Sequence, residues 1–151
     1  MVNADNARSL HLVGQGAMTW MFMDIYQASL YSADGRYQRQ EYPQALKIHY
    51  KKSVSKTSLV DATNKQWQHL ALSTARYQPW LNRLNSLWPD IKKGDNLLFY
   101  VTKNGQGIFY HNGKRLGGIN SREFSDAFLG IWLSKQTSEP VLRRQLIGEY
   151  R

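Results

Sequence analysis

The stretch NLLFYVTKNGQGIFYHNGKRLGGI, residues 96–119, decides the fold of this chain. It holds two Asn-Gly pairs, Asn104-Gly105 and Asn112-Gly113, and each pair lies between segments rich in Leu, Ile, Phe and Tyr. Asn-Gly in such a context is the strongest short-range signal for a type I′ turn that joins two antiparallel strands. The stretch therefore predicts a meander of three strands, over about residues 96–103, 106–111 and 114–119.

Further strands are expected ahead of this meander. Residues 10–32 have the pattern of two extended segments, and residues 45–51 have the pattern of a third. Asp34-Gly35 is a turn signal between them. In the second segment, one face is expected to carry Phe22, Asp24, Tyr26, Ala28 and Leu30.

Helical patterns separate the two groups of strands and also follow the second group. Ser58 and Asp61 have the spacing of a capping box, at the start of a helix that reaches about residue 71. Pro79 is expected to open a second helix, because proline at the first helical position loses no hydrogen bond. Two more helices are expected to begin near Asn120 and at Pro140. This order predicts an α+β fold, a curved antiparallel sheet packed against a layer of helices.

The length and composition fit one domain. The chain has 151 residues, 42% of them hydrophobic, and no repeat or linker divides it. Residues 10–151 are expected to form the domain, after a disordered or extended N-terminal segment at residues 1–9. No apolar run reaches the roughly 18 residues of a membrane-spanning helix, so no transmembrane segment is expected. The absence of cysteine excludes disulfides, thiolate metal sites and cysteine nucleophiles.

No motif predicts a catalytic or metal centre. The four histidines lack the spacing of metal ligands, and neither a dinucleotide-binding glycine motif nor a nucleophile elbow is present. We therefore expect neither a metal nor a cofactor. Tyrosines on the predicted strands either line a cavity with their hydroxyls toward a ligand or stand half-buried at the sheet edge. These tyrosines are Tyr26, Tyr31, Tyr50, Tyr100 and Tyr110.

The charge is strongly positive and unevenly distributed. The net charge is +9, and the segment from Lys47 to Lys93 holds nine basic residues against only Asp61 and Asp90. Such a segment is either a solubilising face or a surface for a nucleic acid, an anionic membrane or an anionic ligand. The tryptophans of this region lie on the apolar stripes of predicted helices, where core packing explains them. This placement argues against nucleic acid, which needs exposed aromatics among the basic residues.

Three stretches together resemble the bacterial chalcone-isomerase-like family. They are FMDIYQASLY at residues 22–31, KGD at 93–95 with the later NG and GGI, and FSDAFLGIWL at 124–133. The final segment, residues 142–148, is similar to the closing helix of the family. The resemblance covers about residues 10–149, and it rests on the order and spacing of these pieces.

The resemblance implies a fold and a choice of activities. The fold would be a long antiparallel sheet curved against helices, with a cleft between them. Plant members close a flavanone ring by addition of a phenolate, whereas other members bind fatty acids without catalysis. Many bacterial members carry a signal peptide, so the resemblance implies a periplasmic location if a signal segment precedes residue 1.

The family's catalytic positions are mostly altered in this chain. The arginine that would stabilise an enolate and anchor a carboxylate corresponds to Met18. The strand threonine corresponds to Tyr26, the tyrosine that opens the first helix to Thr57, and the polar residue of the later helix to Ile131. One of the five positions is retained, as Asn64. Lys47 is a candidate for a substitute cation.

These comparisons predict a non-catalytic protein that holds a small apolar or amphipathic, fatty-acid-like ligand in the cleft between sheet and helices. Trp20, Phe22, Tyr26 and Asn64 are the candidate ligand-binding residues, and no catalytic residue is assigned. One alternative is an active isomerase or lyase with Tyr26 as the acid and a lysine as its electrostatic partner. The other alternative is an interaction module that uses the basic 47–93 face.

Overall fold

The computed structural model describes residues 9–149, so the predicted N-terminal segment lies outside the described residues except for Ser9. Six antiparallel strands form one sheet in chain order, so each strand pairs with its neighbours in the sequence. The strands are β1 (His11–Trp20), β2 (Met23–Ser32), β3 (Gln44–Tyr50), β4 (Asn96–Val101), β5 (Gly107–His111) and β6 (Lys114–Ile119). The predicted meander is confirmed as β4, β5 and β6.

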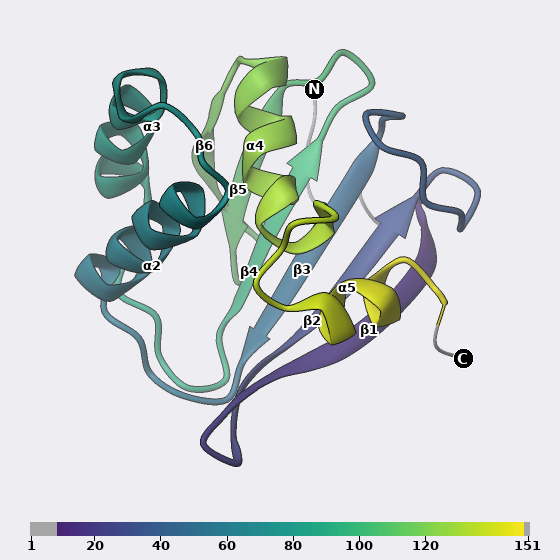
Figure 1. The fold of residues 1–151 in the computed structure, drawn as a ribbon, viewed down its shortest axis with the longest axis horizontal. Helices are drawn as coiled ribbons and strands as arrows, with labels where there is room; N and C mark the ends of the chain where they lie inside the picture. Colours follow the sequence, from purple (N-terminus) through teal and green to yellow (C-terminus); the bar gives the residue numbers. More distant parts are fainter. Residues whose placement is uncertain (1–8, 150–151) are drawn as a thin grey trace.

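The helices lie on one face of this sheet, as Figure 1 shows. Two helices, α2 (Lys56–His69) and α3 (Thr74–Leu87), connect β3 to β4. Two more, α4 (Arg122–Leu133) and α5 (Pro140–Leu146), follow β6. The α+β prediction of an antiparallel sheet with one helical layer is therefore confirmed. No helix within residues 9–149 is long and apolar enough to cross a membrane.

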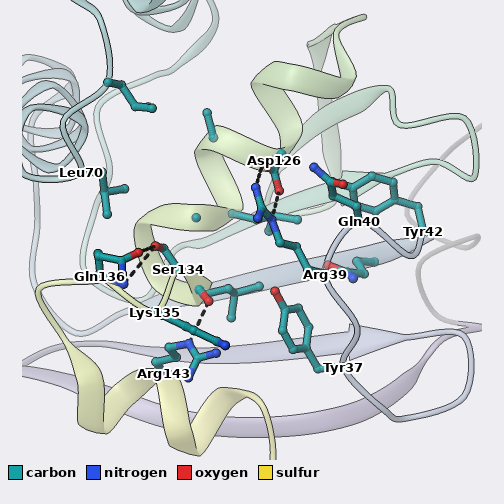
Figure 2. A pocket seen from close by; sticks show the side chains of 16 residues that line it. Tyr37, Arg39, Gln40, Tyr42, Leu70, Asp126, Ser134, Lys135, Gln136 and Arg143 are labelled. Atoms are coloured by element: carbon teal, nitrogen blue, oxygen red, sulfur yellow. Dashed lines mark hydrogen bonds and ion pairs between the residues drawn. The ribbon is translucent and has the colours of Figure 1, made fainter.

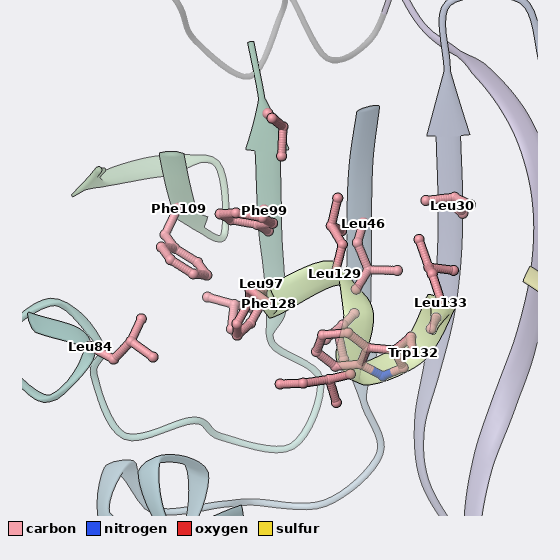
Figure 3. Close-up of a cluster of buried hydrophobic side chains, with 14 of the residues drawn as sticks. Leu30, Leu46, Leu84, Leu97, Phe99, Phe109, Phe128, Leu129, Trp132 and Leu133 are labelled. Carbon is pink, nitrogen blue, oxygen red and sulfur yellow. The ribbon is translucent and has the colours of Figure 1, made fainter. Parts of the chain in front are cut away.

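The main hydrophobic core fills the space between helix α4 and the middle of the sheet (Figure 3). Phe128 of α4 lies 4.9 Å from Phe99 of β4 and 5.3 Å from Phe109 of β5, measured between ring centroids. Both pairs are edge-to-face, the arrangement that aromatic quadrupoles favour. The core continues across β2 and β3 through Leu30 and Leu46, both fully buried. Side chains thus occupy the space between sheet and helices over most of its length.

The two Asn-Gly turns differ from each other. Asn112 and Gly113 both have positive φ, at 51° and 83°, so the predicted type I′ turn is confirmed there. At the first turn only Gly105 has positive φ, at 88°, and Gly105 N donates to Thr102 O at 2.8 Å. A type I turn followed by one left-handed glycine makes this loop longer than a type I′ turn. The prediction of a type I′ turn at Asn104-Gly105 was therefore wrong.

Two predicted helix starts also differ from the structure. The N-cap of α2 is Ser55, whose hydroxyl accepts from Ser58 N, so the helix begins before the expected capping box. Helix α3 begins at Thr74, and Pro79 lies inside it. Starting α3 a turn earlier buries Tyr77 completely against the core. This burial outweighs the single backbone hydrogen bond that an internal proline removes.

Candidate functional site

The cleft that the family resemblance implies is closed around Tyr26. The ring of Tyr26 packs edge-to-face on Tyr50 at 5.8 Å, and its hydroxyl accepts a hydrogen bond from Trp132 Nε1 at 2.8 Å. Tyr50 and Trp132 are themselves buried. Met18, at the position of the family's arginine, is the direct partner of Tyr26 on the neighbouring strand. The thioether of Met18 and the rings of Tyr50 and Trp132 therefore surround Tyr26, where the family resemblance predicts the cleft.

The electrostatics at Tyr26 oppose a role as a catalytic acid. Burial raises the pKa of Tyr26 to about 12, and the hydrogen bond from Trp132 offsets only part of that shift. Among the described residues, the charged group that acts on it is the Glu139 carboxylate, which raises the pKa further. Lys47 cannot serve as the substitute cation, because it points to the opposite face of β3 from the buried Leu46 and Ile48. This geometry excludes Lys47 as the lysine partner of Tyr26 in the isomerase or lyase alternative.

The other predicted ligand-binding residues do not converge on one cleft. Trp20 ends β1, and Phe22 lies in the tight turn before β2, where both are exposed to solvent. The strand alternation that placed Phe22 beside Tyr26 stops at Met23, because Phe22 has a left-handed backbone. The prediction that Trp20 and Phe22 line a cleft is corrected accordingly. Asn64 lies half-buried on α2.

A pocket of about 550 Å³ lies elsewhere, along the C-terminal half of helix α4. The loop between β2 and β3 forms one wall, the connection from α2 to α3 forms another, and Arg143 of α5 closes one end (Figure 2). Its apolar surface comes from Leu70, Leu72, Ala127, Leu129 and Leu133. We call it the α4 pocket.

Cationic side chains dominate the rim of the α4 pocket. Arg39 and Asp126 form a two-pronged ion pair, with Nη2–Oδ2 at 2.8 Å and Nε–Oδ1 at 3.2 Å. Lys135 and Arg143 line the same pocket. Arg143 Nε donates to Leu133 O at 2.9 Å, which anchors the guanidinium at the C-terminal end of α4. Three cations against one carboxylate leave the rim positive.

Two tyrosines complete the wall opposite α4. Burial raises the pKa of Tyr42 to about 12, with a further rise from the Asp126 carboxylate. Burial also raises the pKa of Tyr37, although the nearby Arg143 guanidinium lowers it in part. Both phenols are therefore neutral hydrogen-bond donors at neutral pH. The wall offers hydroxyl donors beside the cationic rim, without a nucleophile or a base.

Sequence reasoning missed the α4 pocket for a physical reason. Its walls come together through contacts such as that of Arg39 with Asp126, which are 87 residues apart. The one signal in the sequence was an irregular, polar segment between β2 and β3 that is too long for a simple hairpin turn.

A second pocket, of about 520 Å³, lies on the face of the sheet away from the helices. It is lined by Tyr31, Ala45, Lys47, Leu98 and Tyr110, with Leu10, Asn96, Asn112 and Gly113 at its edges. It is more open than the α4 pocket, and Lys47 is its one basic side chain. Within residues 9–149, no group of three or more His, Asp or Glu side chains is placed to hold a metal ion.

The six-stranded antiparallel sheet and its single helical layer define a protein with the chalcone isomerase fold. The chain matches the chalcone isomerase-like family over residues 2–148, and it belongs to this family.

One protein sequence and one solved structure are similar to this chain. A Haemophilus influenzae protein described as uncharacterized is 29% identical over 137 residues, or 91% of this chain and 67% of that protein. The crystal structure of a fatty-acid binding protein of Arabidopsis thaliana superposes with a TM-score of 0.70 at 12% identity. That match covers 93% of this chain and 88% of the plant chain. At this identity, the likeness shows a shared fold.

Proposed function

We propose that the protein is a non-catalytic carrier of a small amphipathic anion, such as a fatty acid, and that the α4 pocket holds it. The observation that carries this proposal is the combination of leucine side chains and a cationic rim in one pocket of about 550 Å³. Small-molecule sites are commonly about 300–1,000 Å³, mostly apolar, with a few convergent polar groups. The α4 pocket fits this description.

The pocket offers separate places for the two ends of such a ligand. A carboxylate would lie between Lys135 and Arg143 and would replace the water around these two cations. Neither side chain forms an ion pair with another residue in the described part of the chain. The Tyr37 hydroxyl is placed to donate to the same head group. The alkyl chain would lie along Leu129 and Leu133 of helix α4. The resemblance to a fatty-acid binding protein in fold agrees with this ligand class, although the plant protein's ligand is a property of that protein.

Two features of the structure support the proposal that the protein is not a catalyst. At Tyr26, a developing enolate would find Met18 and buried aromatic rings in place of a cation. Removal of one preorganised donor of this kind typically costs about 3 kcal/mol of transition-state stabilisation. In the α4 pocket, the cations and neutral phenols can bind an anion, and the one carboxylate that lines the pocket, Asp126, is held in its ion pair with Arg39.

Isothermal titration calorimetry with dodecanoate tests the proposal. We expect saturable binding that falls at least about tenfold in Lys135→Gln/Arg143→Gln, because each charge-assisted contact contributes about 1.5–3 kcal/mol. Lys92→Gln/Lys93→Gln removes the same charge from two exposed side chains that do not line the pocket, and this variant should bind as the parent does. Tyr26→Phe should also leave the affinity unchanged. Loss of binding in Tyr26→Phe, with normal binding in the Lys135 and Arg143 variant, would place the ligand in the family cleft and refute the α4 pocket.

The periplasmic location remains a prediction that rests on the family resemblance alone. Fractionation of cells that express the full-length gene, with detection by antibody, would test it. Recovery of the protein with the cytosolic fraction would contradict it.

A further inference from the structure

The hairpin between β1 and β2 ends in four consecutive apolar side chains that face water. Trp20, Met21, Phe22 and Met23 are 61%, 71%, 106% and 45% exposed. Single exposed apolar residues are ordinary on a protein surface, but a contiguous group of large ones marks a site of interaction. We call these four residues the apolar tip.

The backbone of this turn is one that its side chains disfavour. Met21 and Phe22 have φ of 50° and 65°, in the left-handed region. Asn-Gly would occupy the same turn at lower cost, as Asn112 and Gly113 do in the β5–β6 hairpin. Stability of the hairpin therefore does not explain the sequence of the turn. The apolar side chains themselves are the feature that needs an explanation.

Two lysine pairs lie at the same end of the sheet. Lys51 and Lys52 follow β3, and Lys92 and Lys93 precede β4; all four are exposed. An isolated β-bridge joins Val54 to Ile91 and holds the two loops together. We call the four lysines the lysine collar, because they lie beside the base of the β1–β2 hairpin.

The strand pairing determines how far the apolar tip extends beyond the lysine collar. Tyr50, the last residue of β3, pairs with Tyr26, and Lys51 N donates to Ile25 O at 2.8 Å. Beyond Ile25 the hairpin continues alone to Phe22, three residues further. At about 3.3 Å per residue, the tip extends roughly 10 Å past the collar. Figure 1 shows this hairpin projecting beyond the loops that lead into α2 and β4.

The acidic groups at this end do not cancel the collar. Asp24 is exposed at the base of the tip, and Asp90 is exposed in the loop before β4, where it accepts from Lys56 N. Asp95 is mostly buried and bonded to His111. Four exposed lysines thus face two exposed carboxylates, so the end of the sheet stays positive.

We propose that this end of the molecule docks on an anionic lipid bilayer, with the apolar tip inserted and the lysine collar among the head groups. Interfacial apolar groups sink about 5–10 Å into the head-group region, which matches the extension of the tip. Basic side chains near the surface add attraction to anionic lipids. The protein's net charge of +9 acts in the same direction. This docking surface is separate from the α4 pocket, so either proposal can fail alone.

Co-sedimentation with vesicles of phosphatidylcholine and phosphatidylglycerol in equal parts tests the docking. We expect binding that weakens with added salt, and little binding to pure phosphatidylcholine. Met21→Asn/Phe22→Gly should bind at least about tenfold more weakly while keeping its turn, since Asn-Gly suits that backbone. Lys51→Gln/Lys92→Gln should lose about 25-fold, because each lysine near an anionic surface contributes about fivefold.

Arg36→Gln/Lys103→Gln is the matched control, because Arg36 follows β2 and Lys103 follows β4 at the end of the sheet away from the apolar tip, and the net charge changes equally. It should bind as the parent does. Trp20 is the most exposed tryptophan, so its emission should shift to the blue on binding, and Trp20→Phe should abolish the shift. Unchanged binding by the tip variant, or an equal loss in the control, would overturn the proposal. Self-association that the tip variant abolishes, without vesicle binding, would assign the tip to a second copy instead and also overturn it.

Discussion

Two tyrosines of the core, Tyr26 and Tyr77, give opposite predictions for the same chemical change. Tyr26 Oη accepts a hydrogen bond from Trp132 Nε1 at 2.8 Å. Tyr77 Oη is buried and has no hydrogen-bond partner among residues 9–149. Replacement of either residue by phenylalanine removes one hydroxyl and leaves the ring in place. The consequences differ because only the Tyr26 hydroxyl satisfies another buried polar group.

The magnitudes follow from which group loses a partner. Tyr26→Phe leaves the indole N–H of Trp132 without its acceptor, in a side chain that is 8% exposed. An unsatisfied buried donor costs about 1–3 kcal/mol, so the free energy of unfolding should fall by that amount. For a chain of this length, the melting temperature should fall by about 2–10 °C. The Tyr77 hydroxyl gives up its hydrogen bonds to water on folding and gains no partner among the described residues. Tyr77→Phe should therefore leave the free energy of unfolding within about 0.5 kcal/mol of the parent value or increase it.

Urea unfolding followed by near-UV circular dichroism measures both variants. The slope with denaturant should be unchanged, because neither substitution alters the surface exposed on unfolding. A double-mutant cycle with Trp132→Phe should return a coupling of about 1 kcal/mol between Tyr26 and Trp132. If Tyr26→Phe were as stable as the parent, or if Tyr77→Phe lost as much as Tyr26→Phe, the hydrogen-bond argument would be refuted.

Three further predictions concern stability. Gly14→Ala should cost about 2 kcal/mol or more in urea unfolding, because a Cβ there would collide with Gln145 O of helix α5; a neutral result would contradict the observed packing of α5 on β1. Ala71→Gly should add about 0.5–1 kcal/mol, since Ala71 follows Leu70, the C-cap of α2, with φ of 61°; a loss of stability would argue against that backbone. The hydrogen bond from His111 holds the pKa of Asp95 at about 2, below its usual value, so Asp95 stabilises the fold above about pH 4 and this contribution disappears as the pH falls toward 2. The melting temperature of Asp95→Asn should therefore depend less on pH between those two pH values than that of the parent. An unchanged pH dependence would count against the Asp95–His111 pair.

The order of strands and helices could be predicted because it depends on local signals. Hydrophobic alternation, the Asn112-Gly113 turn and Pro140 at the start of α5 each act within a few residues, and each agrees with the structure. Pro79 misled the prediction because the propensity of one residue yielded to the burial of Tyr77.

The candidate site could be predicted less well than the fold. Tyr26 does face the core, but which side chains would fill the space around it depends on Trp132, more than 100 residues away. Phe22 was misplaced because alternation along a strand says nothing about the residue at which the strand turns. The α4 pocket depends on a loop held over a distant helix by Arg39, and no periodicity records such a contact.

The sheet order has a consequence for how the chain reaches its native state. Strands β1 to β3 and strands β4 to β6 are two local meanders, and only the pairing of β3 with β4 joins them. The intervening residues 51–95 must close a long loop before that seam forms, at a cost of about 3 kcal/mol in chain entropy. Helix α4 follows all six strands in the chain and packs over the β3–β4 pairing through the contact of Phe128 with Phe99 of β4. We therefore expect formation of this seam to limit the folding rate, so substitutions there should slow refolding more than substitutions in either outer hairpin.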